Sequence, residues 1–352
     1  MLLDEREIVS LLLLQPLSRL LVWTVQWYFT LVRWAYLLWG LTQPKLVVTK
    51  AGKSADEQLL SIPAVDLAAK IRNGEIPASQ LIEAYIHRIE VVDAQIHAVV
   101  QRNYEDARLQ AKRIDEFLAA VDRESEEFRK LAEKKPLLGV PFSIKDQFFI
   151  KGLKATVGMV CFKELLATED AVVVKKYYAK SRRVARGALI GAGGSVIGIG
   201  TDIAGSIRVP ALMNGIFGLK PGPRLYPSLE GMVPNQLCGY QNEMFGMGPM
   251  ARYAKDLMPV FKVSPFSAFS SPRAQILIGP ENAKALHLDE PVDLSALRFY
   301  AMEGTSSRIC SQPLDADVAG AFRKTVNHFG TVGRQAVGTV TFPLAQYAAN
   351  YW

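Results

Sequence analysis

The chain has 352 residues, which is enough to bury a substantial core as one large domain or two. Hydrophobic residues make up 49% of it and charged residues 21%, a balance that is typical of globular proteins and excludes an intrinsically disordered chain. Its three cysteines are far apart and show neither a disulfide framework nor zinc-ligand spacing. This cysteine usage indicates a reducing, cytosol-facing environment for the folded body.

The net charge of +7 includes a local concentration of bases in which no acidic residue occurs. Its members are Lys175, Lys176, Lys180, Arg182, Arg183 and Arg186. Such a run is typical of a solvated loop or helix end, and it is also compatible with an anionic membrane or nucleic acid as partner. We favour the solvated segment and predict no nucleic-acid partner, because the run offers only Tyr177 and Tyr178 for base stacking.

The N-terminal segment is rich in apolar and aromatic residues. Four of the five tryptophans lie in the first 40 residues, and residues 20–41 are nearly all apolar. That length just suffices for a bilayer, which takes roughly 20 residues to span. The tryptophans recur at helical spacing, a pattern that is also typical of a helix lying in the membrane interface. The acidic start of the chain disfavours a cleaved signal peptide.

We therefore assign residues 1–45 to a membrane-anchoring segment and residues 46–59 to a polar linker. A spanning anchor is the preferred interpretation, an interfacial helix is the second, and a helix buried against a partner is the third. This assignment predicts a membrane protein with a single N-terminal anchor or interfacial helix and a cytoplasmic body.

The next segments show helical periodicity. Ala64, Leu67, Ala68 and Ile71 follow the i, i+3, i+4, i+7 pattern, and Asn73-Gly74 ends that helix. Ser79 is the predicted N-cap of a second helix. A third, charged helix is predicted over residues 104–134, with an inner stripe at Tyr104, Ala107, Ala111, Ile114, Leu118 and Val121.

Short apolar runs downstream predict strands that alternate with helices. The strands are expected at residues 137–145, 275–278, 297–300 and 338–342, and a helix is expected at residues 315–328. This alternation predicts an α/β layer fold.

Several binding motifs are excluded. Gly52-Lys53-Ser54 resembles the end of a P-loop, but Val47 stands where the first glycine is needed. The four histidines are scattered without metal-ligand spacing, and a surface or helix-capping role is preferred for each of them. We predict no cofactor and no metal.

The most informative segment is rich in glycine. Ten glycines fall between Gly187 and Gly222, around the stretch Gly200-Thr201-Asp202-Ile203-Ala204-Gly205-Ser206-Ile207-Arg208. A serine that follows two small residues can sit in a tight turn, where backbone N–H groups converge on one spot and stabilise an oxyanion.

This stretch resembles the nucleophile loop of the amidase-signature family, and within that family the resemblance is to the fatty-acid amide hydrolases. Further similar segments are residues 67–74, 79–90, 136–146, 168–175, 187–221, 248–252 and 297–303. The resemblance implies an α/β amidase-signature fold with a mixed β-sheet flanked by helices. We assign residues 60–352 to a partial amidase-signature domain, because the family domain continues beyond the point that matches Trp352.

The family uses a lysine base, a bridging serine and a nucleophilic serine. By resemblance, Lys145 is the base and Ser206 the nucleophile, and the backbone N–H groups of Ile203, Ala204, Gly205 and Ser206 form the oxyanion hole. Asp202 and Arg208 match residues that we expect to hold the loop. The family usually has glycine where this chain has Ala204, which strains the turn by about 1 kcal/mol if that position needs a positive φ.

The bridging serine is the point of departure from the family. Counting back from Ser206 by the family's spacing reaches Arg182, in a segment without glycine or a serine pair. Ser181 and Ser195 are weak candidates for a substitute, because a proton relay needs contacts of about 2.6–3.2 Å. We therefore expect Ser206-dependent cleavage of lipid amides to be severely reduced.

Two functions follow from the resemblance. The first is an amidase-signature serine hydrolase that cleaves lipid amides through an acyl-enzyme. Its expected partners are a lipid amide and the membrane, and a homo-oligomer is possible as well. The second is a non-catalytic, membrane-associated remnant that binds lipid or a full-length paralogue.

Overall fold

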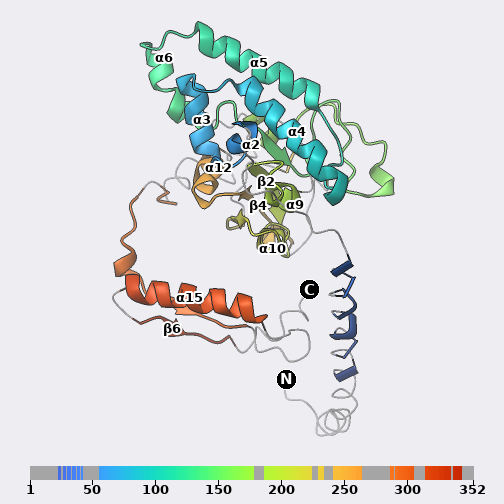
Figure 1. Cartoon of the computed structure of the whole chain (residues 1–352), viewed down its shortest axis with the longest axis vertical. Helices are drawn as coiled ribbons and strands as arrows, with labels where there is room; N and C mark the ends of the chain where they lie inside the picture. Colours follow the sequence, from blue (N-terminus) through green and yellow to red (C-terminus); the bar gives the residue numbers. More distant parts are fainter. Residues whose placement is uncertain are drawn as a thin grey trace. The chain divides into compact units, whose positions relative to one another are not determined.

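The computed structural model describes residues 55–177, 186–223, 229–233, 241–263, 286–288, 290–304, 314–333 and 336–342, together with part of residues 23–42. These residues belong to two structural units. The larger unit comprises residues 46–287, and the smaller one comprises residues 1–45 and 288–352. The larger unit holds a four-stranded sheet and most of the described helices (Figure 1).

The larger unit begins with a series of helices and then alternates helices with strands. In chain order its elements are α2 (Ala55–Leu59), α3 (Ala64–Asn73), α4 (Ala78–Ile96), α5 (Tyr104–Ala120), α6 (Glu126–Arg129), α7 (Leu131–Lys134), β1 (Phe142–Ile144), η1 (Val160–Phe162), α8 (Val172–Tyr177), α9 (Arg186–Gly191), β2 (Ile197–Asp202), α10 (Arg208–Met213), β3 (Phe217–Gly218), α11 (Gln241–Met244), β4 (Gly246–Ala251), η2 (Ala254–Asp256) and α12 (Leu257–Val263).

The sheet is mixed and has the strand order β1-β2-β4-β3. β1 and β2 are parallel, with Ser143 opposite Gly198. β4 runs antiparallel to both β2 and β3. Every residue of β2 and β4 is buried, so other elements cover both faces of these strands. The predicted α/β fold with a mixed sheet and flanking helices is confirmed.

The two faces of the sheet belong to different packing clusters. Successive side chains of a strand point to opposite faces. Accordingly, Met247 of β4 lies in the main core with residues of α3, α4 and α12. Met250 packs instead with Ile190 of α9 and Ala211 of α10. Because α10 follows β2 closely, residues 203–207 link a strand end to the helical layer on this second face.

Close packing of α9 on α10 depends on two glycines. A Cβ atom at Gly187 would lie 2.7 Å from Cβ of Pro210, and one at Gly191 would lie 3.0 Å from the carbonyl oxygen of Asn214. Side chains at these positions would force the two helices apart.

The first predicted helix is confirmed as α3. All four residues of its expected apolar face are buried. Gly74 ends it in the left-handed conformation with φ 76°, which glycine adopts without the steric penalty of a side chain.

The cap expected for the second helix is wrong. α4 begins at Ala78 after Pro77, and Ser79 does not cap it. The carboxylate of Asp115 in α5 accepts the N–H groups of Ala78 at 2.6 Å and Ser79 at 3.0 Å. A side chain 36 to 37 residues away in the sequence therefore satisfies the first N–H groups of α4.

The single helix expected over residues 104–134 is also corrected, because α5 ends at Ala120 and α6 and α7 follow as separate turns. Ser125 caps α6 by accepting the N–H of Phe128, and its own hydroxyl donates to the carbonyl of Asp122. The carboxylate of Asp122 also accepts the N–H of Glu124 at 3.0 Å. Serine and aspartate side chains compete in this way with helical hydrogen bonding. The apolar stripe does hold within α5, where Ala107, Ala111 and Leu118 are buried.

The strand expected at residues 137–145 is shorter than predicted. It forms only over β1, because the N–H of Leu138 bonds to the carbonyl of Lys135 and that of Val140 to the carbonyl of Leu137, which makes residues 135–140 a pair of turns. Gly139 lies in these turns with φ 82°. Lys145 follows directly after the last strand residue.

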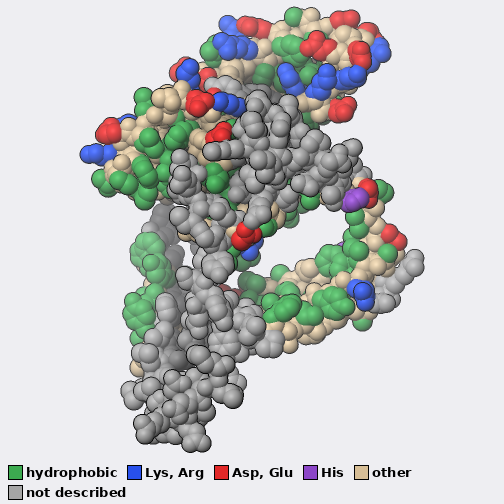
Figure 2. All heavy atoms as spheres, turned by 180° about the vertical axis from the view of Figure 1, so that it is seen from behind, with side chains coloured by type: hydrophobic (Ala, Val, Ile, Leu, Met, Phe, Trp, Pro, Cys, Tyr) green, Lys and Arg blue, Asp and Glu red, His purple; other side chains and the backbone are tan. Residues whose placement is uncertain are grey.

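The outer helices of the larger unit carry charges of both signs. Arg108 of α5 pairs with Glu83 of α4 and with Glu105 one turn before it. Figure 2 shows Lys and Arg side chains interspersed with Asp and Glu over the end of the unit that contains α5 and α6. Of the basic run predicted to be a solvated segment, Lys180, Arg182 and Arg183 lie outside the described residues, whereas Lys175 is exposed and pairs with Glu169.

The described C-terminal part of the smaller unit is a strand–helix–strand arrangement. Its elements are η3 (Leu294–Ala296), β5 (Tyr300–Ala301), α15 (Ala316–Val332) and β6 (Gly338–Thr339), and β5 and β6 are parallel. Phe299 stacks on Phe329 of α15 with ring centroids 4.5 Å apart. The predicted helix is confirmed as α15, and the strand expected at residues 338–342 forms only over β6. The strand expected at residues 297–300 is corrected, because β5 overlaps it only at Tyr300. The strand expected at residues 275–278 lies outside the described residues.

The N-terminal segment is described only at scattered positions, all helical, between residues 23 and 42. Trp23, Trp27, Trp34 and Trp39 are each more than half exposed. In the described part of the chain, no helix combines the length and the apolar character that crossing a membrane requires. The remainder of the predicted anchoring segment lies outside the described residues.

Candidate functional site

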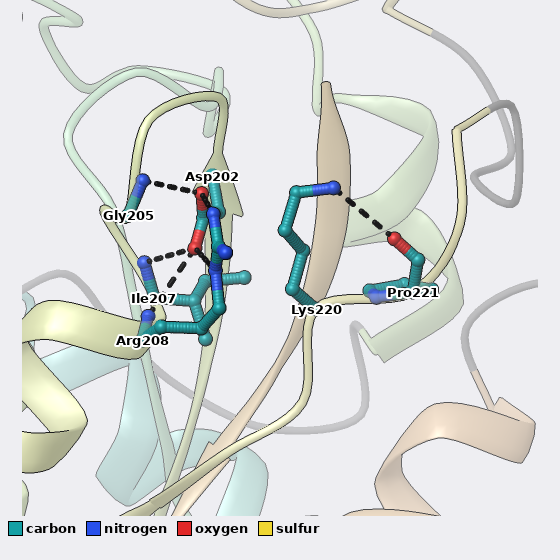
Figure 3. Close-up of polar contacts among 6 residues, drawn as sticks. All are labelled: Asp202, Gly205, Ile207, Arg208, Lys220 and Pro221. Carbon is teal, nitrogen blue, oxygen red and sulfur yellow. Dashed lines mark hydrogen bonds and ion pairs between the residues drawn. The ribbon is translucent and has the colours of Figure 1, made fainter. Parts of the chain in front are cut away.

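The loop between β2 and α10 is organised around the carboxylate of Asp202, the last residue of β2 (Figure 3). Oδ1 accepts the N–H of Gly205 at 2.7 Å, and Oδ2 accepts the N–H groups of Ile207 at 3.1 Å and Arg208 at 3.2 Å. The guanidinium of Arg208 donates to both oxygens at 2.9 Å. A single side chain thus fixes both the turn and the start of α10.

This carboxylate is strongly held in its ionised form. Burial of Asp202 acts to raise its pKa, but the hydrogen bonds from the Arg208 side chain and from the three backbone N–H groups outweigh burial and hold the pKa well below its usual range. The Asp202 side chain is fully buried, whereas that of Arg208 is 56% exposed. The predicted loop-holding role of this pair is confirmed.

Ser206 lies exposed at the turn that Asp202 organises. Gly205, the residue before it, has φ 121°, and a Cβ atom there would lie 2.8 Å from Cγ2 of Val209. Glycine is therefore required at this position by both conformation and space. The loop leaves Ser206 exposed, and hydrogen bonds to Asp202 hold the residues on either side of it.

The backbone N–H groups of the loop have different partners. That of Gly205 points to Asp202, as described above. Ile203, Ala204 and Ser206 have no hydrogen bond from their N–H groups to another described residue. Ala204 is not among the described non-glycine residues with positive φ, so the conditional strain of about 1 kcal/mol does not arise there.

Lys145 enters the same region from the end of β1. Its Nζ donates to the hydroxyl of Thr201 at 3.1 Å, and that hydroxyl donates to Oε1 of Gln147 at 2.6 Å. A carbonyl oxygen only accepts, so the Thr201 hydroxyl gives its proton to Gln147 and turns its lone pairs toward Lys145. Both Thr201 and Gln147 are buried, which fixes the lysine head group from the strand side.

The sequence analysis did not single out Thr201 and Gln147 as partners of Lys145. Lys145 and Gln147 are two residues apart, the spacing that puts side chains on one side of an extended chain. Thr201 belongs to the glycine-rich stretch. These two signals could have suggested the contact, but the pairing of β1 with β2 is what brings the residues together.

Lys145 and Ser206 line one cavity of about 540 Å³. The other described residues that line it are Val100, Asp146, Gln147, Thr156, Val157, Gly158, Gly187, Ala188, Pro210, Asn214 and Met250. The cavity combines apolar walls with polar groups near the serine and the lysine, a composition common among small-molecule sites. The two residues predicted to carry the chemistry thus face a shared space.

The candidates for a bridging residue differ in their placement. Arg182 and Ser181 lie outside the described residues. Ser195 is buried, its hydroxyl donates to the carbonyl of Ile197 at 2.7 Å, and it does not line the cavity with Ser206.

Among the histidines, His97 forms the C-cap of α4 with φ 46°, as a capping role predicts. No cluster of three potential metal ligands occurs within the described ranges.

The fold and the loop define the class to which this chain belongs. The sequence profile of the family described as Amidase matches residues 80–181 and 186–291, which together are more than half of the chain. The chain belongs to the amidase family. It resembles the solved structure of a fatty acid amide hydrolase with a TM-score of 0.61 and 18% identity, over 83% of this chain and 54% of that one. The amidase-signature fold is thereby confirmed.

Two curated relatives indicate the breadth of the family around this chain. It is 30% identical to fatty-acid amide hydrolase 2 of Homo sapiens, over 86% of this chain and 61% of the relative. It is also 30% identical to a glutamyl-tRNA(Gln) amidotransferase subunit of Streptomyces coelicolor, over 79% of this chain and 59% of the relative. The chain therefore spans about three fifths of the length of these relatives.

Proposed function

We propose that this chain carries the acyl-transfer site of an amidase-signature serine hydrolase that acts on lipid amides. The observation that carries the proposal is the common cavity of Ser206 and Lys145, next to a loop that Asp202 fixes. An exposed serine, a lysine whose head group donates to Thr201, and backbone N–H groups with no partner among the described residues are components that amide cleavage requires.

In the proposed reaction, Oγ of Ser206 attacks the carbonyl carbon of the amide and loses its proton. The oxyanion that forms is stabilised by backbone N–H groups of the predicted oxyanion hole. Those of Ile203, Ala204 and Ser206 serve here, since that of Gly205 is bound to Asp202. The C–N bond breaks as the amine takes up a proton, and water then releases the acid from the acyl-enzyme.

Lys145 is the proposed base, and it acts while neutral. Thr201 and Gln147 keep its head group at the cavity wall, which orients it for proton transfer. In the family's arrangement a bridging serine links the lysine to the nucleophile, whereas Arg182 stands at the matching position of this chain. Arginine offers no acceptor and is not deprotonated at working pH, so we propose that turnover is low.

A lipid amide is the proposed substrate class. The likeness to fatty-acid amide hydrolase 2 supports it, as do the apolar walls that Val100, Val157 and Met250 contribute to the cavity. The chain is just as identical to a subunit of an amidotransferase, so the likeness to fatty-acid amide hydrolase 2 does not by itself select lipid amides. The choice of a lipid amide as substrate rests equally on the apolar cavity and on the aromatic N-terminal segment. The aromatic N-terminal segment fits a substrate that is drawn from a membrane.

We further propose the organisation given above: a membrane anchor at residues 1–45, a linker at 46–59, a partial amidase domain at 60–352 and a body in the cytoplasm. The exposed tryptophans of the first segment support contact with a membrane interface.

The alternative function is a non-catalytic, membrane-associated remnant that binds lipid or a full-length paralogue. One observation favours it: the segment before Gly187 has no serine pair.

Hydrolysis of an oleamide-type substrate by the purified chain and by Ser206→Ala tests the proposal. We expect slow hydrolysis, below about 1 per second, that disappears in the variant. Hydrolysis that is equal in both proteins would refute Ser206 as the nucleophile. Turnover in the range typical of enzymes, ~1–10³ per second, would show instead that no relay has been lost.

A further inference from the structure

Val157 has a backbone conformation that is unfavourable for its residue type. Its φ is 53°, in the left-handed region. A valine is disfavoured there because its branched Cβ crowds the neighbouring carbonyl oxygen. Gly158 follows with φ 75°, a value that glycine adopts freely. A valine therefore stands at a position where glycine would be unstrained.

The strained turn is held by the residue next to the candidate base. Oδ2 of Asp146 accepts the N–H of Thr156 at 3.2 Å, the hydroxyl of Thr156 at 2.7 Å and the N–H of Val157 at 2.9 Å. The N–H of Gly158 in turn donates to the Thr156 hydroxyl at 3.2 Å. Strain of this kind persists only where the surrounding contacts over-determine the conformation, and it occurs frequently at functional sites.

The turn also forms a wall of the site. Thr156, Val157 and Gly158 all line the cavity that holds Lys145 and Ser206. Among them Val157 contributes a branched, apolar and half-buried side chain. The chain thus keeps backbone strain at the position where a bulky side chain narrows the cavity.

We propose that Val157 is a specificity-determining residue, whose side chain limits the width of the substrate group that enters the cavity of Ser206. The inference rests on the proposed function in so far as this cavity is the substrate site. Asp146 is the positioning residue that holds Val157 there.

Two substitutions separate the size of the side chain from the strain of the backbone. Val157→Gly removes both, whereas Val157→Ala shortens the side chain and keeps an unfavourable φ. The matched controls are Val160→Gly and Val160→Ala, because Val160 is the first residue of the neighbouring helix η1, is 79% exposed and does not line the cavity. We expect the melting temperature of Val157→Gly to exceed that of Val160→Gly by about 2–4 °C.

Specificity is measured on the full chain in detergent, by the rate at which Ser206 is labelled. Two fluorophosphonate probes are used, one with a straight alkyl chain and one with a chain branched near phosphorus. We expect the wild type to favour the straight probe. Val157→Gly and Val157→Ala should shift the ratio of rates toward the branched probe by about 10-fold or more, since each methylene in a pocket is worth roughly 10- to 200-fold. The Val160 variants should keep the wild-type ratio.

An unchanged ratio in Val157→Gly, with Ser206 still labelled, would overturn the inference and leave the proposed function standing. A lower melting temperature than that of Val160→Gly would overturn the claim of strain. If no form of the chain is labelled, the proposed function fails, and calorimetric titration of straight and branched fatty acids into Ser206→Ala decides the inference. A preference for the straight acid that Val157→Gly removes would uphold it, and any other result would overturn it.

Discussion

At the scale of single residues, Asp202 organises the loop of the candidate site, because its carboxylate accepts five hydrogen bonds from four groups of the loop. Replacing it by asparagine removes the charge that Arg208 pairs with and leaves buried N–H groups poorly matched. We expect Asp202→Asn to lower the free energy of unfolding by about 2–3 kcal/mol, as measured by urea denaturation. Asp66→Asn is the control, because Asp66 forms a half-exposed ion pair and should cost below about 1 kcal/mol.

The pH dependence of this effect follows from the sign of the pKa shift. The pKa of Asp202 is lower in the folded chain than in the unfolded one, so its contribution to stability is fully present above the usual aspartate pKa of about 4. It is lost as the pH falls below that value. The stability difference between wild type and Asp202→Asn should therefore shrink on acidification below about pH 4. A difference that grows in acid would contradict this account.

The loop contacts of Asp202 and Arg208 were predictable because they join residues that are close in the sequence and belong to one motif. The contact of Thr201 with Gln147 joins residues 54 positions apart and depends on the pairing of β1 with β2. The hydrogen bond from the N–H of Val157 to Asp146 joins residues that are 11 positions apart in irregular chain. The spacing of residues in the sequence does not predict these hydrogen bonds, because they depend on the three-dimensional arrangement of the chain.

At the scale of elements, the start of α4 depends on a side chain from α5. Asp115→Ala leaves the N–H groups of Ala78 and Ser79 without their carboxylate. We expect it to lower the free energy of unfolding by about 1–2 kcal/mol, the usual cost of a lost N-cap. Ser79→Ala should change stability by less than about 0.5 kcal/mol, because Ser79 does not cap the helix. The opposite order of the two effects in thermal or urea unfolding would restore Ser79 as the cap.

Helices were predictable where one apolar face sets their length. α3 ends at the glycine that its sequence indicates, and its buried residues are those of the expected stripe. The 104–134 segment kept its apolar spacing only as far as α5, because polar residues at 122 and 125 formed their own local hydrogen bonds. Propensity and spacing decide whether a helix forms, whereas its ends depend on individual polar side chains.

At the scale of the whole molecule, the proposed membrane anchor at residues 1–45 predicts in which cell fraction the protein is found. Deleting residues 1–44 should move the protein from the membrane pellet to the soluble fraction, because the aromatic apolar stretch is removed. Replacing Trp23, Trp27 and Trp34 by alanine should weaken membrane association to a smaller extent, since these exposed side chains are suited to the interface. Unchanged pelleting of the deletion variant in detergent-free buffer, without aggregation, would refute the anchor.

The fold of the larger unit was predictable from the alternation of helical and extended segments and from the resemblance to the family. The strand order was not predictable, because β4 lies between β2 and β3 although it follows both in the sequence. As a result, β2 of the glycine-rich stretch lies between the buried strands β1 and β4. This strand order is one reason why the sequence motif alone did not predict the cavity that Ser206 and Lys145 share.

The central claim is that Ser206 is a nucleophile held at a catalytic loop, and intact-mass and peptide analysis after fluorophosphonate treatment tests it most directly. We predict one slow, stoichiometric addition at Ser206, which is lost in Ser206→Ala. It should be retained in Ser195→Ala, whose hydroxyl is buried and bonded to Ile197. Addition at another serine, or a wild-type chain that stays unlabelled while a full-length relative is labelled under the same conditions, would contradict the claim.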